Sequence, residues 1–507
     1  MIRLERIFQD GVTLQRRMPI RIWGTSDMHQ TVSVALNGET LLENAEIGQT
    51  FSLVLPVQEA AENARLSITG TYDTVELERV NIGEVWIAGG QSNMEFLLRY
   101  DKDGKTEIAS ADDDGLRFYD VGEYSFPEEE SRSHKDSTGW DKWMTFRPEH
   151  AEYFSAVAVY FAKELRRCLG VPVGVVGCNW AGTTASSWTD ESWLAADPDL
   201  RSYLDDYADA VKDLDMEEYC RRYDETLAFM ESPAMAGAMD ALLRGKFTLR
   251  DLLRLLPSLK HLRSFSIPMG PRNPNAPGVL YRAMVKQIAG YTCRGVIWYQ
   301  GESDDVKAGI YDKLFTAMIR CWRDAWQDEL PFLFVQLAPF GKWLNSTGEQ
   351  YPVLREAQET VSRTVPMCYM ASIMDCGMEK DIHPKNKRPV GERLALLARG
   401  KVYGEDILCE SPAFLSAEIL DGEILLRFAN AGSGLEIRGS ELNALEVTAD
   451  GRRIDTSASA EGDVLSIRSG EIRKDSLIGI RFAWTAYCEV NLYNSAGLPA
   501  RPFRVSL

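Results

Sequence analysis

The chain has 507 residues, of which 45% are hydrophobic and 26% charged, and its formal net charge at pH 7 is −19. That length exceeds what one hydrophobic core usually supports, so we expect two or three domains of ordinary globular composition. The acidity argues against nucleic acid or an anionic membrane surface as a partner, and no apolar run approaches the about 20 residues that span a bilayer.

The N-terminal segment and the cysteines bear on the compartment. The first residues, M-I-R-L-E-R-I-F-Q-D-G, lack the long apolar core of a secretory signal, so we expect a cytoplasmic protein; a processed exported form fits the same sequence. The nine cysteines are odd in number and scattered without a C-x-x-C pair, which disfavours a disulfide framework and structural zinc. We therefore expect reduced, mostly buried cysteines, no metal and no other cofactor.

Residues 1–81 are expected to form an N-terminal β-sandwich. Short runs of alternating or apolar residues, separated by turn signals, predict strands at residues 13–14, 20–23, 31–36, 52–55 and 64–68.

Residues 82–403 are expected to form an α/β domain. Apolar runs predict strands at residues 85–87, 173–176, 295–299, 332–337 and 367–373. Amphipathic patterns between them predict helices at residues 154–167, 281–289, 311–326 and 353–365. Continuous apolar strands that alternate with helices are typical of a parallel sheet covered on both faces. Residues 197–262 are charge-rich and helical in pattern, and we interpret them as an inserted helical cap.

Residues 404–507 return to a strand pattern, for example at residues 424–428 and 478–482. They predict a second all-β domain at the C-terminal end.

The segment V-W-I-A-G-G-Q-S-N-M-E-F places Ser92 directly after a predicted strand. Functional groups of open parallel sheets collect at the carboxyl ends of strands, and the glycine pair allows a tight turn whose N–H groups can face an oxyanion. Ser92 is therefore a candidate nucleophile. The plain alternative is a helix N-cap, with Glu95 completing a capping box. A phosphate cradle is disfavoured because no Lys-Ser or Lys-Thr follows the glycines.

A serine nucleophile needs a base, and among five histidines His383 has the best context, D-I-H-P-K-N-K. Pro384 predicts the start of a helix and an extended residue before it. Side chains two apart in extended chain point to the same side, so Asp381 can hold one ring nitrogen of His383 while the other faces Ser92. The alternative is that His383 caps a helix and Asp381 is a solvated turn residue.

Two further loops follow predicted strands and offer amide groups or small residues where an oxyanion hole needs them. They are G-C-N-W-A-G-T at residues 177–183 and W-Y-Q-G-E-S-D at residues 298–304. Glu302 and Asp304 suggest a metal site, which the lack of a nearby histidine disfavours.

Together the segments G-E-V-W-I-A-G-G-Q-S-N-M-E, G-V-I-W-Y-Q-G-E-S-D and D-I-H-P-K-N-K-R-P-V-G-E-R-L-A resemble the sialate O-acetylesterase family of the SGNH hydrolases. The resemblance implies an SGNH-like α/β domain flanked by β-sandwich domains. It also implies a nucleophile at Ser92, a general base at His383 and an acidic partner at Asp381. The family often spaces that pair as D-x-x-H, whereas this chain has D-x-H, so Asp375 and Glu379 stay open as substitutes.

The resemblance extends to the remaining site residues. It implies oxyanion donors at the Ser92 backbone, at Ala181 or Gly182, and at the side chain of Gln300. The residues assigned to substrate binding are Gln91, Trp180 and Glu302; Trp180 and Trp188 are both suited to stack on a sugar, although one of them is expected in the core. The usual T-P-I-E-A-W is T-T-A-S-S-W here, which puts the substrate pocket in question.

The predicted function is therefore a serine esterase that removes O-acetyl groups from a sugar, with O-acetylated sialic acid as the first candidate. Acetylated xylan or another plant glycan is the alternative substrate, and a non-catalytic carbohydrate-binding protein is the alternative of a different class. The net charge of −19 does not exclude an anionic sugar, because a local arginine can bind its carboxylate.

Overall fold

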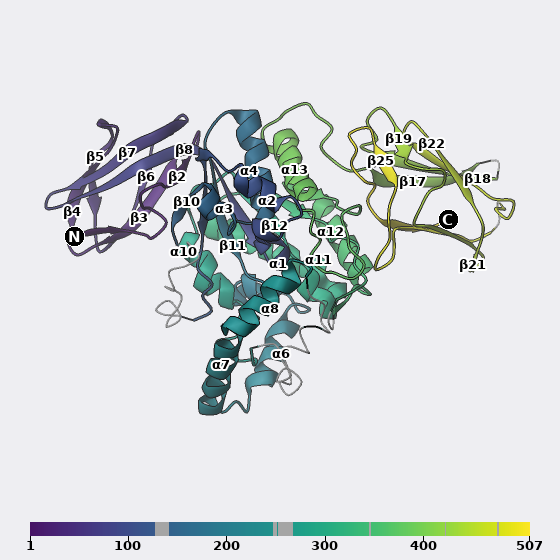
Figure 1. The fold of residues 1–507 in the computed structure, drawn as a ribbon, viewed down its shortest axis with the longest axis horizontal. Coiled ribbons are helices and arrows are strands. Elements are labelled where there is room, and N and C mark those ends of the chain that lie inside the picture. Colours follow the sequence, from purple (N-terminus) through teal and green to yellow (C-terminus); the bar gives the residue numbers. More distant parts are fainter. Residues whose placement is uncertain (127–140, 247–250, 252–266, 344–345, 421, 474–475) are drawn as a thin grey trace. The chain divides into compact units, whose positions relative to one another are not determined.

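The computed structural model describes residues 1–126, 141–246, 251, 267–343, 346–420, 422–473 and 476–507 (Figure 1). The chain divides into two compact units. The first comprises Met1–Trp298 and Lys313–Pro331, and the second comprises Tyr299–Asp312 and Phe332–Leu507. The mixture of helices and sheets confirms an α/β protein, and within the described ranges every helix is too short or too polar to cross a membrane.

The N-terminal strands form two sheet layers, and each strand predicted there is present. One is the antiparallel set β1 (Ile2–Leu4), β3 (Ile20–Ser26) and β6 (Thr50–Leu55). The other contains β4 (Gln30–Leu36), β5 (Glu39–Ile47), β7 (Ala61–Gly70) and, beside β8, β2 (Thr13–Gln15). Asn37 and Gly38 both have positive φ between β4 and β5, at 52° and 84°, as a tight hairpin turn requires.

Strand β8 (Thr74–Gly90) belongs to both the N-terminal layer and the sheet that carries the candidate nucleophile. Its first part pairs with β7, and its last part pairs in parallel with β11 (Val173–Asn179). All residues from Val80 to Gly90 are buried, as expected for a parallel strand with both faces covered. The predicted boundary between residues 81 and 82 falls inside this strand.

The sheet of the first unit has the order β10-β9-β11-β8-β12. Strand β9 (Asp113–Asp120) is parallel to β11, and β10 (Trp143–Phe146) is antiparallel to β9 at the edge. Both strands were missing from the sequence-based prediction, whereas β12 (Gly295–Tyr299) has the predicted bounds. Helix α4 (Ala156–Leu169) packs on β9 and β11, is capped by the Ser155 side chain and ends at Gly170 with φ 64°.

The other helices up to residue 326 include the predicted insertion. They are α1 (Ser92–Glu95), α2 (Gly104–Ala109), α3 (Pro148–Ala151), α5 (Glu191–Ala196), α6 (Arg201–Val211), α7 (Met216–Met230), α8 (Pro233–Leu243), α10 (Lys286–Ile288) and α11 (Tyr311–Trp326). Helices α6 to α8 confirm helical structure in the first part of the insertion; its leucine cluster near residue 255 lies outside the described residues. The predicted helix at residues 281–289 is a π-helical turn (Tyr281–Val285) that continues into α10.

The second unit contains the segment of the candidate base and the C-terminal strands. Strand β13 (Phe332–Val335) is parallel to β16 (Cys368–Ala371). The hairpin β14 (Lys342–Trp343) and β15 (Ser346–Thr347), and the helices α12 (Tyr351–Thr364) and α13 (Arg388–Leu397), belong to the same unit. Six of the nine cysteines of the whole chain are buried, which confirms the expectation of mostly buried cysteines.

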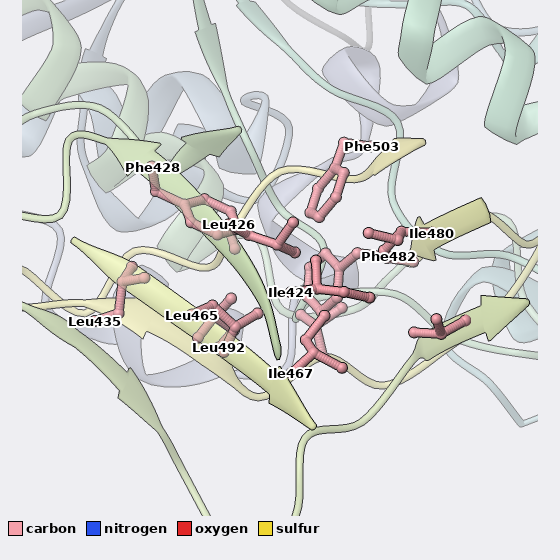
Figure 2. Close-up of a cluster of buried hydrophobic side chains, with 14 of the residues drawn as sticks. Ile424, Leu426, Phe428, Leu435, Leu465, Ile467, Ile480, Phe482, Leu492 and Phe503 are labelled. Carbon is pink, nitrogen blue, oxygen red and sulfur yellow. The ribbon is translucent and has the colours of Figure 1, made fainter. Parts of the chain in front are cut away.

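The C-terminal strands form two four-stranded sheets and a two-stranded pair. Their bounds are β17 (Ala413–Leu420), β18 (Glu423–Ala429), β19 (Leu435–Ile437), β20 (Leu445–Ala449), β21 (Arg452–Arg453), β22 (Ser457–Glu461), β23 (Val464–Arg468), β24 (Ile478–Phe482), β25 (Leu492–Asn494) and β26 (Phe503–Ser506). Alternate residues of these strands build a closed apolar core that includes Ile424, Leu465 and Phe482 (Figure 2).

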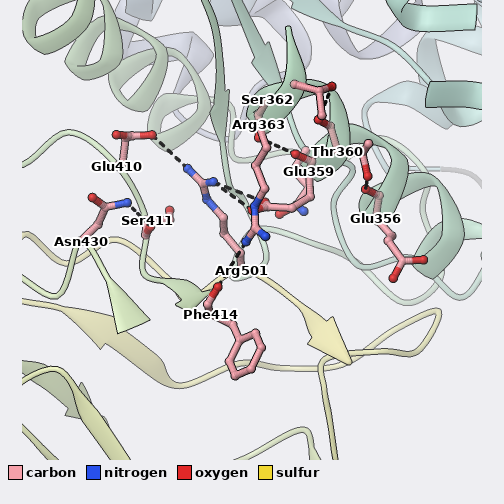
Figure 3. Close-up of polar contacts among 12 residues, drawn as sticks. Glu356, Glu359, Thr360, Ser362, Arg363, Glu410, Ser411, Phe414, Asn430 and Arg501 are labelled. Atoms are coloured by element: carbon pink, nitrogen blue, oxygen red, sulfur yellow. Dashed lines mark hydrogen bonds and ion pairs between the residues drawn. The ribbon is translucent and has the colours of Figure 1, made fainter. Parts of the chain in front are cut away.

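Buried arginines connect α12 with the C-terminal strands inside the second unit. Arg501 lies 3.3 Å from the Glu359 carboxylate and 3.4 Å from that of Glu410 (Figure 3). Arg355, which is fully buried, donates hydrogen bonds to four carbonyl oxygens: those of Leu337, Ala338, Thr485 and Ala486. These bonds join the end of β13 to the segment that follows β24.

Candidate active site

Ser92 begins helix α1 immediately beyond the carboxyl end of β8. Gly90 has φ 139°, and a Cβ at Gly89 would lie 2.7 Å from the Trp298 ring, so this turn requires its glycines. Gln91 is the N-cap residue, and its carbonyl oxygen accepts the N–H groups of Met94 and Glu95. Ser92 is thus the first helical residue and not the cap, so the capping-box interpretation is wrong.

The loop after β11 is tied to this turn by three hydrogen bonds. The Trp180 N–H donates to the Gly90 carbonyl at 3.1 Å, and the Asn179 amide donates to the Ala88 carbonyl at 3.1 Å. The Ala181 N–H donates to the Glu95 carboxylate at 2.6 Å. Of the two oxyanion candidates in this loop, Ala181 already uses its N–H, whereas Gly182 is exposed with φ 72°.

We call residues 89–95 with the loop 177–183 the serine segment. Glu95 lines a cavity of about 110 Å³ together with Asp120 and Glu123, at the carboxyl ends of β9 and β11. Burial raises the pKa of Glu95 to about 7 against the lowering effect of the Ala181 N–H, and the Asp120 charge adds to the rise. Burial and the charge of Asp141 raise the pKa of Asp120 to about 7. Both carboxyl groups therefore have pKa values close to neutral pH.

The remaining predicted residues of the first unit differ in exposure. Trp188 is fully buried, donates its indole N–H to the Thr183 hydroxyl at 3.0 Å and belongs to the core. Trp180 is half-buried, and Gln91 is buried with only 2% exposed. Trp180 therefore keeps surface that a ligand can reach.

We call residues 375–387 the histidine segment. Helix α13 begins at Arg388 with Pro389 in its first turn, so the prediction that Pro384 starts a helix is wrong. Asp381 accepts the backbone N–H of His383 at 2.8 Å, and its carboxylate lies 3.6 Å from Nδ1 of the same residue. An aspartate that binds the N–H two residues on makes a local turn, which replaces the expected extended chain and still brings the two side chains together.

The electrostatics of the histidine segment favour a neutral imidazole beside an ionised carboxylate. Burial lowers the pKa of His383 below its ordinary 6.5; Asp381 opposes this effect, and the charges of Lys387 and Lys385 add to it. For Asp381, burial raises the pKa, but the contacts from His383 and Lys385 outweigh burial and leave a lowered value. Lys385 Nζ lies 3.0 Å from the Asp381 carboxylate. These are the protonation states that a general base and its orienting acid need at neutral pH.

The two substitute acids have other contacts. Asp375 is bound by both terminal nitrogens of Arg393, at 2.6 and 2.8 Å. Burial raises the pKa of Asp375, but Arg393 outweighs it and lowers the value. Glu379 is exposed. Asp381 is therefore the acid whose contacts best suit the orienting role.

The loop after β12 uses its polar groups internally. Gln300 is fully buried; its amide donates to Asp304, and its side-chain oxygen accepts the Tyr311 hydroxyl at 3.0 Å. Glu302 is 7% exposed and begins a short 3-10 helix (Glu302–Ile310). Across the residues with described placement, His, Cys, Asp and Glu side chains form no group of three or more suited to hold a metal ion.

Comparison with known proteins finds similarity to carbohydrate esterases. Residues 272–398 match a family model described as carbohydrate esterase, sialic acid-specific acetylesterase. Mouse sialate O-acetylesterase is 25% identical over 95% of this chain and 90% of its own length, and the human protein is 24% identical over 95% and 88%. The crystal structure of a carbohydrate acetylesterase from Xanthomonas citri superposes with a TM-score of 0.76 and 29% identity, covering 100% of this chain and 99% of that chain. The chain is therefore similar, over nearly its whole length, to sialate O-acetylesterases and to a carbohydrate acetylesterase of known structure.

These similarities show that the chain is a carboxylic ester hydrolase of the carbohydrate O-acetylesterase type. The family model covers the histidine segment and the loop that contains Gln300 and Glu302. The serine segment lies outside the region covered by that model and inside the alignments with the full-length relatives.

Two features of the candidate site were missed from the sequence. One is the bond between Glu95 and the Ala181 N–H, because a capping box explained Glu95 equally well. The other is Trp343, whose ring centre lies 5.1 Å from that of His383 with the ring planes at 88°. Nothing in the residues around Trp343 signals a contact with a histidine forty positions later.

Proposed function

We propose that the protein is a serine esterase that removes O-acetyl groups from sugars with Ser92 as nucleophile, His383 as general base and Asp381 as orienting acid. The observation that carries the proposal is the buried His383, whose lowered pKa keeps the imidazole neutral while Asp381 lies at its Nδ1 atom. The position of Ser92 at the end of a buried parallel strand, after two glycines, supports the nucleophile assignment.

The proposed reaction is acyl transfer in two steps. The Ser92 oxygen attacks the acetyl carbonyl carbon while His383 accepts the hydroxyl proton. The tetrahedral intermediate collapses to an acetyl-enzyme, and the departing sugar oxygen takes the proton from His383. Water, deprotonated by the same imidazole, then releases acetate and restores Ser92. The N–H groups of Ser92 and Gly182 are the proposed oxyanion donors, and one such donor contributes about 3 kcal/mol to lowering the barrier.

Two substrate classes follow from different observations. The names of the curated relatives favour O-acetylated sialic acid. Among the described residues, the cavity lined by Glu95, Asp120 and Glu123 has no basic side chain in its lining to bind a sugar carboxylate, which favours a neutral acetylated glycan such as acetylxylan. Acetate release from O-acetylated sialic acid, compared with release from acetylated xylo-oligosaccharides, decides between them. Binding of either sugar without acetate release would favour a non-catalytic protein.

Labelling with a fluorophosphonate tests the catalytic assignment. We expect peptide mass spectrometry to find the label on Ser92 of the wild type and none on Ser92→Ala. In His383→Ala the same serine should react about a hundredfold more slowly, because the base that activates it is gone. Circular dichroism verifies that both variants fold. If Ser92→Ala hydrolyses p-nitrophenyl acetate at the wild-type rate, Ser92 is not the nucleophile.

A further inference from the structure

We propose that Trp343 is a sugar-binding residue. The ring of the acetylated sugar packs on its indole while His383 acts as general base in the hydrolysis of the acetyl ester. This inference rests on the proposed function for the role of His383. It assigns to the hairpin β14–β15 a part in choosing carbohydrate esters over simple esters.

The first support is that the hairpin and the histidine segment are held together by backbone bonds. The N–H groups of Gly341 and Lys342 both donate to the carbonyl oxygen of Glu379, at 3.1 and 2.9 Å. Phe340 forms an isolated parallel bridge with Met378, and Trp343 pairs with Ser346 across the hairpin. Trp343 is therefore fixed relative to the chain that leads directly into Asp381 and His383.

The second support is that Trp343 keeps exposed surface beside a buried imidazole, unlike four tryptophans of the core. Trp86, Trp188, Trp298 and Trp322 are all buried to at least 99%, and they serve the core. Trp343 is half-buried, although its ring lies edge to face with the buried imidazole of His383 at 5.1 Å. A large apolar surface that remains accessible next to a reactive group is typical of a ligand-binding residue.

The ligand class follows from the chemistry of the indole. Its flat apolar face fits the C–H-rich face of a pyranose ring, and its N–H can donate to a sugar hydroxyl. Neither contact requires a charge on the sugar, so the role suits both substrate classes considered above.

The experiment compares two esters with Trp343→Ala and Trp343→Phe in the full-length chain. One ester is whichever of the two acetylated sugars the wild type hydrolyses faster. The other is ethyl acetate, which has neither a sugar nor an aromatic ring. We expect Trp343→Ala to raise KM for the sugar ester about tenfold while kcat changes less than twofold. The kcat/KM for ethyl acetate should stay within twofold, and Trp343→Phe should restore most of the sugar affinity.

The matched control is Trp484→Ala, a half-buried tryptophan of the second unit that stacks under Arg504. This variant should leave KM and kcat unchanged for both esters. Equal losses on both esters in Trp343→Ala would show that Trp343 only holds His383 in place, and unchanged kinetics on both would show no role; either result overturns the inference. A wild type that hydrolyses neither ester would overturn the proposed function first, and this inference with it.

Discussion

In the serine segment, burial raises the pKa of Glu95 to about 7, and it does the same for the neighbouring Asp120. In the histidine segment, Asp381 and Asp375 experience burial too, yet contacts from His383 and Lys385 in one case, and from Arg393 in the other, lower their pKa values. The same residue type thus holds a proton near neutral pH in one region and a full charge in the other. The chemistry of an acid is set by its contacts and cannot be read from its identity.

The difference also indicates how each region is specified. The serine segment is shaped mainly by the main chain, through positive-φ glycines, strand register and N–H bonds. The histidine segment depends on side-chain charges placed by a short irregular loop. Charge substitutions should therefore affect catalysis most in the histidine segment.

The largest expected effect tests whether the two segments serve one reaction. Ser92→Ala and His383→Ala should each lower kcat for p-nitrophenyl acetate by about 10⁴- to 10⁶-fold, and the double variant should be no worse than either single variant. Stopped assays at high enzyme concentration measure these residual rates. Losses that multiply in the double variant would show that the two residues act independently.

The next effect separates the two acids of the histidine segment. Asp381→Asn should lower kcat by about 10²- to 10⁴-fold, because the imidazole loses its orienting charge. Asp375→Asn should leave kcat within a few-fold and instead lower the free energy of unfolding by about 1–3 kcal/mol, since Arg393 loses its charged partner. Kinetics and urea unfolding on both variants measure this contrast. If Asp375→Asn proves the more damaging to kcat, the orienting role moves to Asp375.

The pH profile supplies a control for that comparison. The base must be neutral, and its pKa is lowered, so activity of the wild type should fall only below pH 6.5. Because Asp381 raises the pKa of His383, the residual activity of Asp381→Asn should persist to still lower pH.

A smaller effect concerns Glu84, an acid inside the buried part of β8. Its carboxylate accepts Arg16 at 2.7 Å and Arg294 at 2.9 Å, and only 1% of the side chain is exposed. Glu84→Gln should lower the free energy of unfolding by about 3 kcal/mol at pH 7, because two arginines lose their counter-charge.

The pH dependence of this loss has a definite sign. Burial raises the pKa of Glu84, but Arg294, Arg16 and Gln15 outweigh it and lower the value from 4.5. The stabilisation is therefore present above pH 4.5 and disappears as the pH falls through the folded-state pKa. Urea unfolding of both proteins at pH 7 and near pH 4 should show the difference shrinking on acidification; a constant difference would contradict the ion-pair explanation.

The smallest effect concerns Glu95, for which the sign is reversed. Its folded-state pKa, about 7, lies above the ordinary 4.5, so the contribution of Glu95 to stability should be greatest below pH 4.5 and decline as the pH rises to about 7. One pH unit of pKa difference corresponds to about 1.4 kcal/mol, so the decline should be at most about 3 kcal/mol. Glu95→Gln should lack this part of the decline in urea unfolding at pH 5 and pH 8. A parallel decline in both proteins would assign it to Asp120 alone.

Elements with a strong apolar period could be predicted from the sequence. The strands at residues 295–299 and 478–482 and the helix at residues 311–326 have the predicted bounds, since each is a clear apolar run or an amphipathic helix. Strand β9 was missed because D-D-G-L-R-F-Y-D is interrupted by Arg117. That arginine is 3% exposed and donates hydrogen bonds to backbone carbonyls of Gly11 and Asp114, contacts that only the tertiary fold supplies.

For the candidate site too, the local features could be predicted and the contacts between distant segments could not. The strand end before Ser92 and the close spacing of Asp381 and His383 are local, so the sequence was sufficient to select them. The start of α13 was misplaced because Pro384 and Pro389 give the same signal, and the Asp381 turn satisfies the backbone without a helix. Trp343 and the partner of Glu95 depend on contacts between distant segments, which no local pattern encodes.

The continuity of β8 limits how this protein can be divided. A fragment that begins at residue 82 would cut a 17-residue strand and strip the ladder partners from its N-terminal end, so chimeras that exchange the N-terminal strands need their junction ahead of Thr74. For the same reason, an antibody or tag that distorts the β7–β8 pair would also disturb the strand that leads to Ser92.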